Sequence, residues 1–194
     1  LKTIAVPYGE IPVYSGDTPN KESNVQYTYV FNGKWSPEIV AVTESKTYTA
    51  QFDAILNSYT VVWKNYNGAI LETDTVEYGT VPTYDGSDPI KEGNAQFSYT
   101  FNGWDNDVVA VTGPATYTAT FLQTTNKYII TFVDWDGTEL QSSEVEYGKT
   151  PSYEGETPTR IKDAQFTYTF KDWSPTIDVV TGDQTYTATY TETT

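Results

Sequence analysis

The stretch YTVVWKNYNGAILETDTVEYG at Tyr59–Gly79 returns as YIITFVDWDGTELQSSEVEYG at Tyr128–Gly148. The alignment continues without a gap until Phe121 meets Tyr190, and 26 of the 63 aligned pairs are identical. Self-similarity at a fixed spacing is the signature of repeat architectures. The chain is therefore a tandem array, and a single repeated unit decides its fold.

A third copy of the unit lies upstream. The segment YTYVF at Tyr27–Phe31 matches FSYTF at Phe97–Phe101, and shortly afterwards Trp35 matches Trp104 at an offset one residue shorter. One extra residue in one strand of a pair is the usual origin of a β-bulge. We therefore interpret Lys34 as a one-residue insertion and predict a bulge there.

These alignments divide the chain into repeat 1 (residues 1–57), repeat 2 (58–126) and repeat 3 (127–194). The junctions are expected to be short linkers at Asp53–Ser58 and Leu122–Lys127. The chain contains no Met, so Leu1 is not expected to be a native start, and we expect the sequence to be part of a longer chain.

Each unit reads mainly as β-structure. Tyr59–Lys64 is a β-branched and aromatic run of strand length, and Val76–Tyr78 closes a second strand. Between them, Asn67 and Gly68 suit a tight hairpin turn because both residue types tolerate positive φ. Two further strands follow in each unit, one running into a Trp and one with the pattern TYTAxF or TYTATY.

A short helix is predicted between the second and third strands. Thr18-Pro19, Asp88-Pro89 and Thr157-Pro158 resemble a helix N-cap followed by Pro at the first helical position. About two helical turns could fit there. Four strands and one short helix make each unit a small α+β domain, mostly β.

The composition of the chain argues against several classes of function. The net charge is −15, from 26 acidic against 11 basic residues, and such a surface repels nucleic acid and anionic membranes. The chain has no Cys and no His, so thiol nucleophiles, imidazole bases and the usual zinc ligands are missing. No apolar run approaches the roughly 20 residues of a membrane span. We expect no enzyme activity, no cofactor and no membrane insertion.

The combined motifs resemble a known family. A YxVxFxxxDG-like first strand, a VxYG second strand, a Pro-rich loop, an aromatic strand entering one Trp and a closing TYTAxY look like the Listeria–Bacteroides repeat, the internalin-B-type B repeat of bacterial surface proteins. The resemblance implies tandem β-grasp (ubiquitin-like) domains in secreted or wall-attached bacterial proteins. It also implies roles in spacing, adhesion and weak interaction, without a shared catalytic site.

Aromatic residues are the first candidates for ligand contact. Trp35, Trp104 and Trp173 recur once per unit, either as a sugar-stacking platform or as core residues, and the small size of the unit favours the core. Trp135 and its counterpart Tyr66 lie in the hairpin turn, where side chains tend to be exposed. We expect them to contact a neighbouring repeat, a glycan or a protein.

Acidic groups are weaker candidates. Asp105 and Asp107 form the densest cluster, with Asp134 and Asp136 as a second, and oxygen ligands of this kind suit calcium. The first cluster occurs in one copy only, and residues like those of the second are typical of turns. No metal site is predicted.

Two covalent chemistries were also weighed. Glu77 and Glu146 recur and could serve glycoside hydrolysis, but Pro7 takes that place in repeat 1 and the units are too small for a deep cleft. A Lys–Asn/Asp isopeptide crosslink would need a Lys at the recurring basic position, which is Lys21, Lys91 and then Arg160. Neither activity is predicted.

The sequence thus predicts a non-catalytic region of an extracellular bacterial surface protein that acts as a spacer and adhesion-type interaction module. A glycan-binding module using exposed aromatic residues is the alternative. Repeat 1 lacks the counterpart of Tyr59–Lys64, because Leu1–Val6 aligns with Leu71–Val76. Repeat 1 could fray, it could borrow a strand from a neighbouring molecule, or the boundary near Asn57 could be misplaced.

Overall fold

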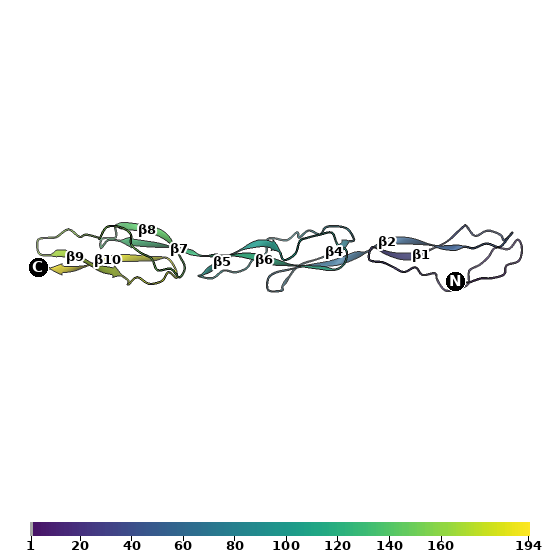
Figure 1. Cartoon of the computed structure of the whole chain (residues 1–194), viewed down its shortest axis with the longest axis horizontal. Coiled ribbons are helices and arrows are strands. Elements are labelled where there is room, and N and C mark those ends of the chain that lie inside the picture. The colour runs from purple at the N-terminus through teal and green to yellow at the C-terminus, as the bar shows by residue number, and fades with distance from the viewer. Residues whose placement is uncertain (1) are drawn as a thin grey trace. The chain divides into compact units, whose positions relative to one another are not determined.

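The computed structural model describes residues 2–194, so Leu1, the first residue of repeat 1, lies outside the described part. The described chain is all-β and has no helix. Its strands are β1 (Tyr27–Ser36), β2 (Thr49–Leu56), β3 (Ser58–Lys64), β4 (Ile70–Glu77), β5 (Phe97–Trp104), β6 (Ala115–Thr125), β7 (Lys127–Val133), β8 (Glu139–Glu146), β9 (Thr167–Ser174) and β10 (Gln184–Thr193) (Figure 1). No described helix is long and apolar enough to cross a membrane.

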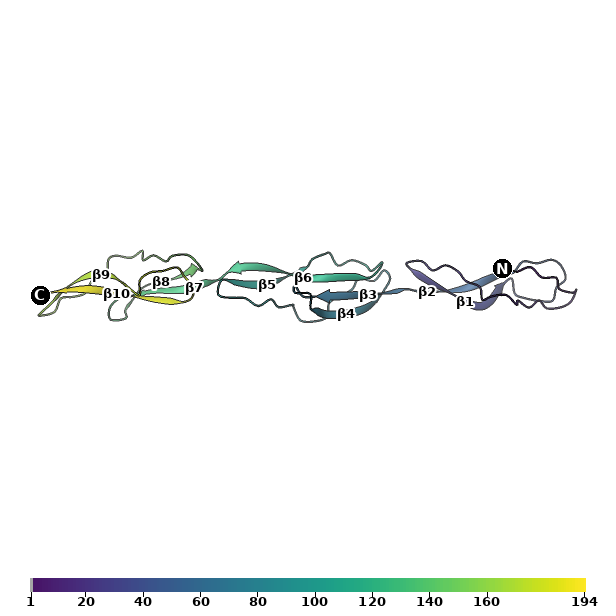
Figure 2. The same ribbon diagram turned by 90° about the horizontal axis from the view of Figure 1, so that it is seen from below.

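The strands form three sheets. Repeat 1 holds the antiparallel pair β1-β2, and the other two sheets have the orders β4-β3-β6-β5 and β8-β7-β10-β9. In each four-stranded sheet the first strand of the repeat is central: β3 pairs antiparallel with β4 and parallel with the start of β6, and β7 does the same with β8 and β10 (Figure 2). The strand predicted at Tyr59–Lys64 is therefore present as β3 and is paired on both edges.

The contacts group the chain into two compact units. One contains the described residues up to Ser87 together with Trp104–Ala119, and the other contains Asp88–Gly103 together with Thr120–Thr194. The repeat boundaries after residues 57 and 126 stay a prediction from the sequence alignment.

Repeats 2 and 3 each close a core of the same design. In repeat 2 the buried residues are Val61, Trp63, Val111 and Tyr117, and in repeat 3 their counterparts are Ile130, Phe132, Val180 and Tyr186. Two of the four come from the central strand in each case, where alternation directs every second side chain into the core. Burial of these large side chains is the main favourable term in units this small.

The predicted helix, and with it the α+β class, is wrong. The segments after Pro19, Pro89 and Pro158 contain no helical turn, and these three prolines are buried. The carbonyl oxygens of Asn24, Val25 and Gln26 accept hydrogen bonds from Asn57 and Tyr59 instead of from their own segment. In a helix these carbonyl oxygens would accept from N–H groups of the same segment. Their bonds to Asn57 and Tyr59 therefore favour the non-helical path. Without the helix, the structure gives no support to a β-grasp fold.

A tyrosine holds the start of the same loop. The Tyr84 hydroxyl donates a hydrogen bond of 3.0 Å to the carbonyl oxygen of Ser87, and Tyr14 does the same to Asp17. The ring lies across Gly86, where a Cβ atom would overlap the tyrosine hydroxyl. The recurrent Pro-x-Tyr-x-Gly pattern therefore encodes a ring folded over the backbone rather than a helix start.

The hairpin turn also differs from the prediction. Gly68 and Gly137 adopt φ of +84° and +87°, but no described non-glycine residue has positive φ, so Asn67 does not. The Gly68 N–H donates to the Asn65 carbonyl oxygen, and the Asn65 N–H donates to the Ala69 carbonyl oxygen. Tyr66, Asn67 and Gly68 therefore form a three-residue turn in which the left-handed Gly68 makes a G1 bulge, not the two-residue type I′ turn.

The bulge expected from the Lys34 insertion is confirmed. The β1-β2 register shifts between Phe31 and Trp35, which pair with Phe52 and Ala50. The matched hairpin β9-β10 also shifts, but it accommodates one residue fewer. The insertion is therefore absorbed where the hairpin is already irregular.

The two segments expected to be linkers between repeats lie almost entirely in strands. β2 runs to Leu56 and β3 begins at Ser58, so Asn57 alone separates them, and Asn126 alone separates β6 from β7. The Asn126 side-chain amide donates to the carbonyl oxygens of Asn94 and Ala95 at 2.8 and 3.1 Å. Asn57 makes the equivalent bonds to Asn24 and Val25.

Replacing the junction asparagine should weaken the preceding loop. Asn126→Ala removes two hydrogen bonds, and at about 0.5–1.5 kcal/mol each we expect a loss of stability of about 1–3 kcal/mol. Amide hydrogen exchange of Asn126 and Tyr147 should accelerate, because the Tyr147 N–H donates to the Asn126 carbonyl. Gln123→Ala, at an exposed strand position, is the control. Equal exchange in both variants would contradict the junction role.

Candidate functional site

Trp135 and Tyr66 lie at corresponding places in the turns after β7 and β3. Their side chains are 49% and 47% exposed, so the predicted exposure is confirmed. In each turn the preceding side chain fixes the backbone, because Asp134 and Asn65 accept from the N–H of the next residue at 2.8 Å. The two residues belong to different compact units.

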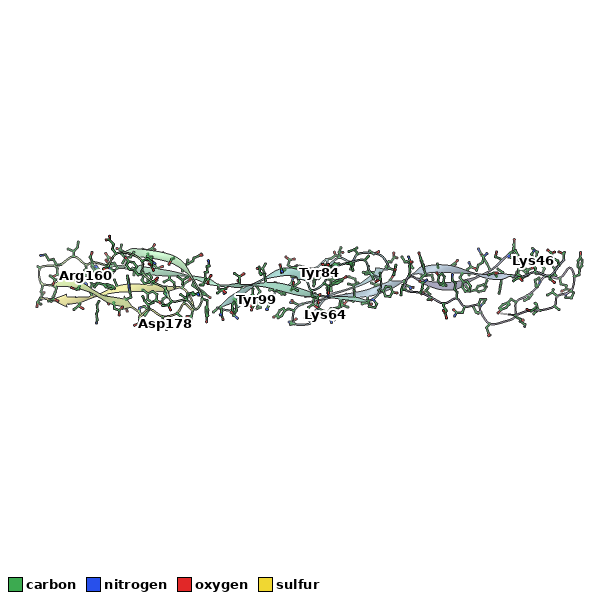
Figure 3. The ribbon with its side chains drawn as sticks, in the orientation of Figure 1. Lys46, Lys64, Tyr84, Tyr99, Arg160 and Asp178 are labelled. Atoms are coloured by element: carbon green, nitrogen blue, oxygen red, sulfur yellow. The ribbon has the colours of Figure 1, made fainter. Side chains whose placement is uncertain are left out.

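The Trp135 ring has a cation against one face. The Arg160 guanidinium carbon lies 4.2 Å from the Trp135 ring centroid and 3.8 Å from that of Tyr168 (Arg160 is labelled in Figure 3). Both distances are within the range of a cation–π interaction. The face that a sugar ring would stack against on this side is therefore occupied by the protein's own arginine.

Two tyrosine–aspartate hydrogen bonds flank the arginine. The Tyr168 hydroxyl donates to Asp163 at 2.6 Å, and the Tyr190 hydroxyl donates to Asp134 at 2.7 Å. The first bond lowers the pKa of Asp163 and raises that of Tyr168, because it favours the carboxylate and the neutral phenol. Burial, with the bond to Asp134, raises the pKa of Tyr190. Arg160, Trp135 and these four residues form what we call the arginine sandwich.

The arginine sandwich has simpler counterparts in the other repeats. The Lys21 ammonium lies 3.6 Å from the Tyr29 ring centroid, and Lys91 lies 3.8 Å from that of Tyr99. The recurring basic position was recognised in the sequence, but its aromatic partner was not. The signal was available, because the third strand of each repeat carries a Tyr at the matching place.

The other candidate residues have structural partners. Asp105 accepts from the Thr118 backbone N–H at 2.8 Å, and this bond is the main cause that lowers its pKa. Asp136 accepts from the Thr138 N–H at 2.9 Å, which lowers its pKa in the same way. Among residues 2–194, no three His, Cys, Asp or Glu side chains are grouped so that they could hold a metal ion.

The recurrent tryptophans belong to the cores. Trp104 packs against Trp63 with a centroid distance of 4.7 Å, and Trp173 packs against Phe132 at 4.8 Å. Trp35 lies 4.8 Å from Tyr14. Glu77 and Glu146, the carboxylates weighed for hydrolysis, are exposed at the ends of β4 and β8.

The Asp163–Tyr168 bond gives a titration that can be measured. Asp163 has a lowered pKa when folded, so its contribution to stability is present above the unfolded pKa and is lost as the pH falls through the folded value. Tyr168→Phe should raise the pKa of Asp163 toward its ordinary value in a carboxyl NMR titration. Tyr99→Phe, in the repeat where Asn94 replaces Asp163, should leave it unchanged. An unchanged pKa in Tyr168→Phe would contradict the assignment.

Comparison with known proteins finds likeness among solved structures. No family model matches the sequence, and no curated protein matches it. Among solved structures, the chain is similar to "Streptococcal High Identity Repeats in Tandem (SHIRT) domains 3-4 from cell surface protein", with 16% sequence identity and a TM-score of 0.36 over 70% of this chain and 98% of that chain. At this similarity no property of that protein is transferred here, and the resemblance to the Listeria–Bacteroides repeat stays a prediction.

Proposed function

We propose that the chain is a non-catalytic tandem-repeat region of an extracellular bacterial surface protein, where it acts as a spacer and interaction module. The observation that carries this proposal is that repeats 2 and 3 build their cores from side chains at the same four positions. Val61, Trp63, Val111 and Tyr117 in one repeat match Ile130, Phe132, Val180 and Tyr186 in the other. A unit that repeats its core suits a structural task better than a reaction.

The residue inventory supports the same proposal. The chain has no Cys that could be oxidised outside the cell, and it has no His for acid–base chemistry. Its net charge of −15 disfavours binding to nucleic acid. The resemblance to the Listeria–Bacteroides repeat, from the motifs alone, also favours a wall-attached or secreted bacterial protein. Neighbouring repeats and proteins at the cell surface are the proposed partners.

A surface-display experiment tests the spacer role. The chain is placed between a cell anchor and a reporter epitope, with zero, one or two additional copies of residues 58–126 inserted after residue 126. Antibody access to the epitope through a surface polymer layer should rise with each copy. Access that does not depend on copy number would contradict the proposal.

Glycan binding is the second candidate, because the half-exposed Trp135 ring remains available on the side away from Arg160. We expect a glycan array to give no saturable binding with the chain, with Trp135→Ala or with Tyr66→Ala. Saturable binding that Trp135→Ala abolishes, while the variant keeps its circular dichroism spectrum, would favour the glycan module over the spacer.

A further inference from the structure

Three asparagines of the chain are each followed directly by a glycine. In such a pair the backbone nitrogen of the glycine can attack the side-chain carbonyl carbon of the asparagine, because glycine has no Cβ atom to obstruct the approach. The φ angles of the three glycines are +78°, +84° and +84°, so the pairs also share a backbone conformation. The pairs are Asn32-Gly33, Asn67-Gly68 and Asn102-Gly103.

The reaction open to these pairs is deamidation through a cyclic imide. The glycine nitrogen forms a bond to the asparagine Cγ atom, the Cγ–Nδ2 bond breaks, and Nδ2 leaves as ammonia with the proton that the glycine nitrogen gives up. Water then adds to one of the two imide carbonyl carbons and opens the ring. The product is aspartate or isoaspartate, so the chain gains one negative charge and water is the only other reactant.

The turn after β3 holds the reacting groups of Asn67. The Gly68 N–H donates to the Asn65 carbonyl oxygen at 2.8 Å, so the attacking nitrogen is already engaged. The Asn67 Oδ1 atom accepts from the Ala69 N–H at 3.0 Å, which fixes the side chain in the turn. The turn must open before the imide can close, and the structure therefore protects Asn67.

The side-chain amide of Asn32 is held at both of its polar atoms. Its Nδ2 atom donates to the Asp53 carboxylate at 3.0 Å, and its Oδ1 atom accepts from the Lys34 N–H at 3.1 Å. Ring closure must pull the amide away from these partners. It would also replace the donor with a carboxylate beside Asp53, and like charges at short range repel. Asn32 is therefore protected as well.

The side-chain amide of Asn102 is exposed and has no hydrogen bond among residues 2–194, because the bond from the Thr120 hydroxyl goes to the main-chain carbonyl oxygen of Asn102. The sequence of repeat 2 explains the difference from Asn32. The counterpart of Asp53 is Leu122, which is 58% exposed and offers no side-chain acceptor. The counterpart of Lys34 is missing, because that residue is an insertion in repeat 1.

The backbone is irregular at this place of the hairpin. In β1-β2, Asn32 falls within the register shift between Phe31 and Trp35. In β9-β10, the counterpart of Asn102 is Lys171, which has no Cα partner in the ladder. A residue at a bulge is not held by regular ladder hydrogen bonds on both sides. Asn102 thus combines an unbonded amide with a position at which the hairpin tolerates a change of path.

We infer that Asn102 is a site of spontaneous deamidation in the folded protein, whereas hydrogen bonds protect Asn32 and Asn67. The modification places a new negative charge near the end of β5. Where the product is isoaspartate, the main chain runs through the former side chain, and the carbonyl group that accepts from Thr120 becomes a carboxylate beside it. The inference does not depend on the spacer role.

The first test follows the three sites in the whole folded chain. After incubation at neutral pH, peptide mapping by mass spectrometry, with chromatographic separation of isoaspartate from aspartate, gives a rate for each site. We expect Asn102 to convert about threefold to tenfold faster than Asn32 and Asn67, which is the factor for one hydrogen bond that must break. Equal rates at the three sites of the folded chain would overturn the inference.

The same measurement in denaturant separates the effect of the fold from that of the local sequence. The three rates should come together there, because the hydrogen bonds at Asn32 and Asn67 are lost. A ranking that persists unchanged in denaturant would show that neighbouring residues in the sequence set the rates, and the inference would then be wrong.

The second test exchanges the residue opposite the asparagine. Leu122→Asp supplies the carboxylate that Asp53 provides in repeat 1, and it should slow deamidation of Asn102 about threefold or more. Leu122→Ala is the matched control, because it removes the leucine without adding an acceptor, and it should leave the rate unchanged. An unchanged rate in Leu122→Asp, with the circular dichroism spectrum retained, would contradict the inference.

The converse variant is Asp53→Leu, which gives Asn32 the neighbour that Asn102 has. Deamidation of Asn32 should accelerate by a similar factor, because its Nδ2 atom loses the acceptor. This variant decides the question if Leu122→Asp does not fold. No acceleration at Asn32 would mean that the bond to Asp53 gives no protection.

Discussion

Removing the central aromatic ring should unfold the repeat that contains it. Trp63 is 1% exposed and Phe132 is fully buried, and each contacts three other rings. Truncation of such a residue to Ala typically costs about 3–5 kcal/mol, because it removes buried surface and leaves a cavity. We expect Trp63→Ala to destabilise repeat 2 and Phe132→Ala to destabilise repeat 3 by this amount.

The measurement must resolve the repeats, since a chain with several cores need not unfold in two states. Amide exchange at Val111 and Tyr117 reports on repeat 2, and exchange at Val180 and Tyr186 reports on repeat 3. Trp63→Phe is the matched control, because Phe occupies that place in repeat 3, and it should cost less than half as much. A single substitution that weakens both repeats equally would contradict two separate cores.

The Trp63→Phe control also tests whether Trp63 and Asp74 stabilise the core as a pair. The indole N–H of Trp63 donates to the Asp74 carboxylate at 2.8 Å, and repeat 3 has Phe132 and Ser143 at the two corresponding places. Adding Asp74→Ser to Trp63→Phe should therefore recover part of the stability that Trp63→Phe removes. The double variant reproduces the pair that already folds in repeat 3.

Strand positions were predictable because they depend on local pattern. The alternation in Tyr59–Lys64 directs Val61 and Trp63 to one face, and this period survives in any sheet. Comparison of the copies also located the bulge at Lys34, because an insertion in one copy must be absorbed between fixed strands.

The helix was mispredicted because Thr-Pro and Asp-Pro give a local signal, whereas the path of the loop is decided by distant partners. Asn57 and Tyr59 donate hydrogen bonds to the carbonyl oxygens of residues 24–26. The loop sequence itself gives no sign of these distant donors. The contact of Arg160 with Trp135 was missed for the same reason. Arg160 and Trp135 are 25 residues apart in the sequence and meet only after the sheet forms.

Repeat 1 should open far more readily than repeats 2 and 3. Residues 1–57 alone contain no counterparts of Val61 and Trp63, and a fully buried branched or aromatic side chain contributes about 1.5–3 kcal/mol. The missing pair therefore amounts to at least about 3 kcal/mol, which is a factor of about 100 in the opening equilibrium. Hydrogen exchange in a dilute monomer measures this factor directly, since it reports local opening within one chain.

The sharpest comparison uses matched hairpins. Phe31 and Phe52 pair in β1-β2, and Phe170 and Tyr190 pair at the same place in β9-β10, where the register shift beside the pair spans one residue fewer. We expect the larger part of the difference in their protection to come from the central strand, which β7 supplies in repeat 3. Equal protection would mean that repeat 1 closes its core without a counterpart of β3, and the boundary near Asn57 would then be wrong.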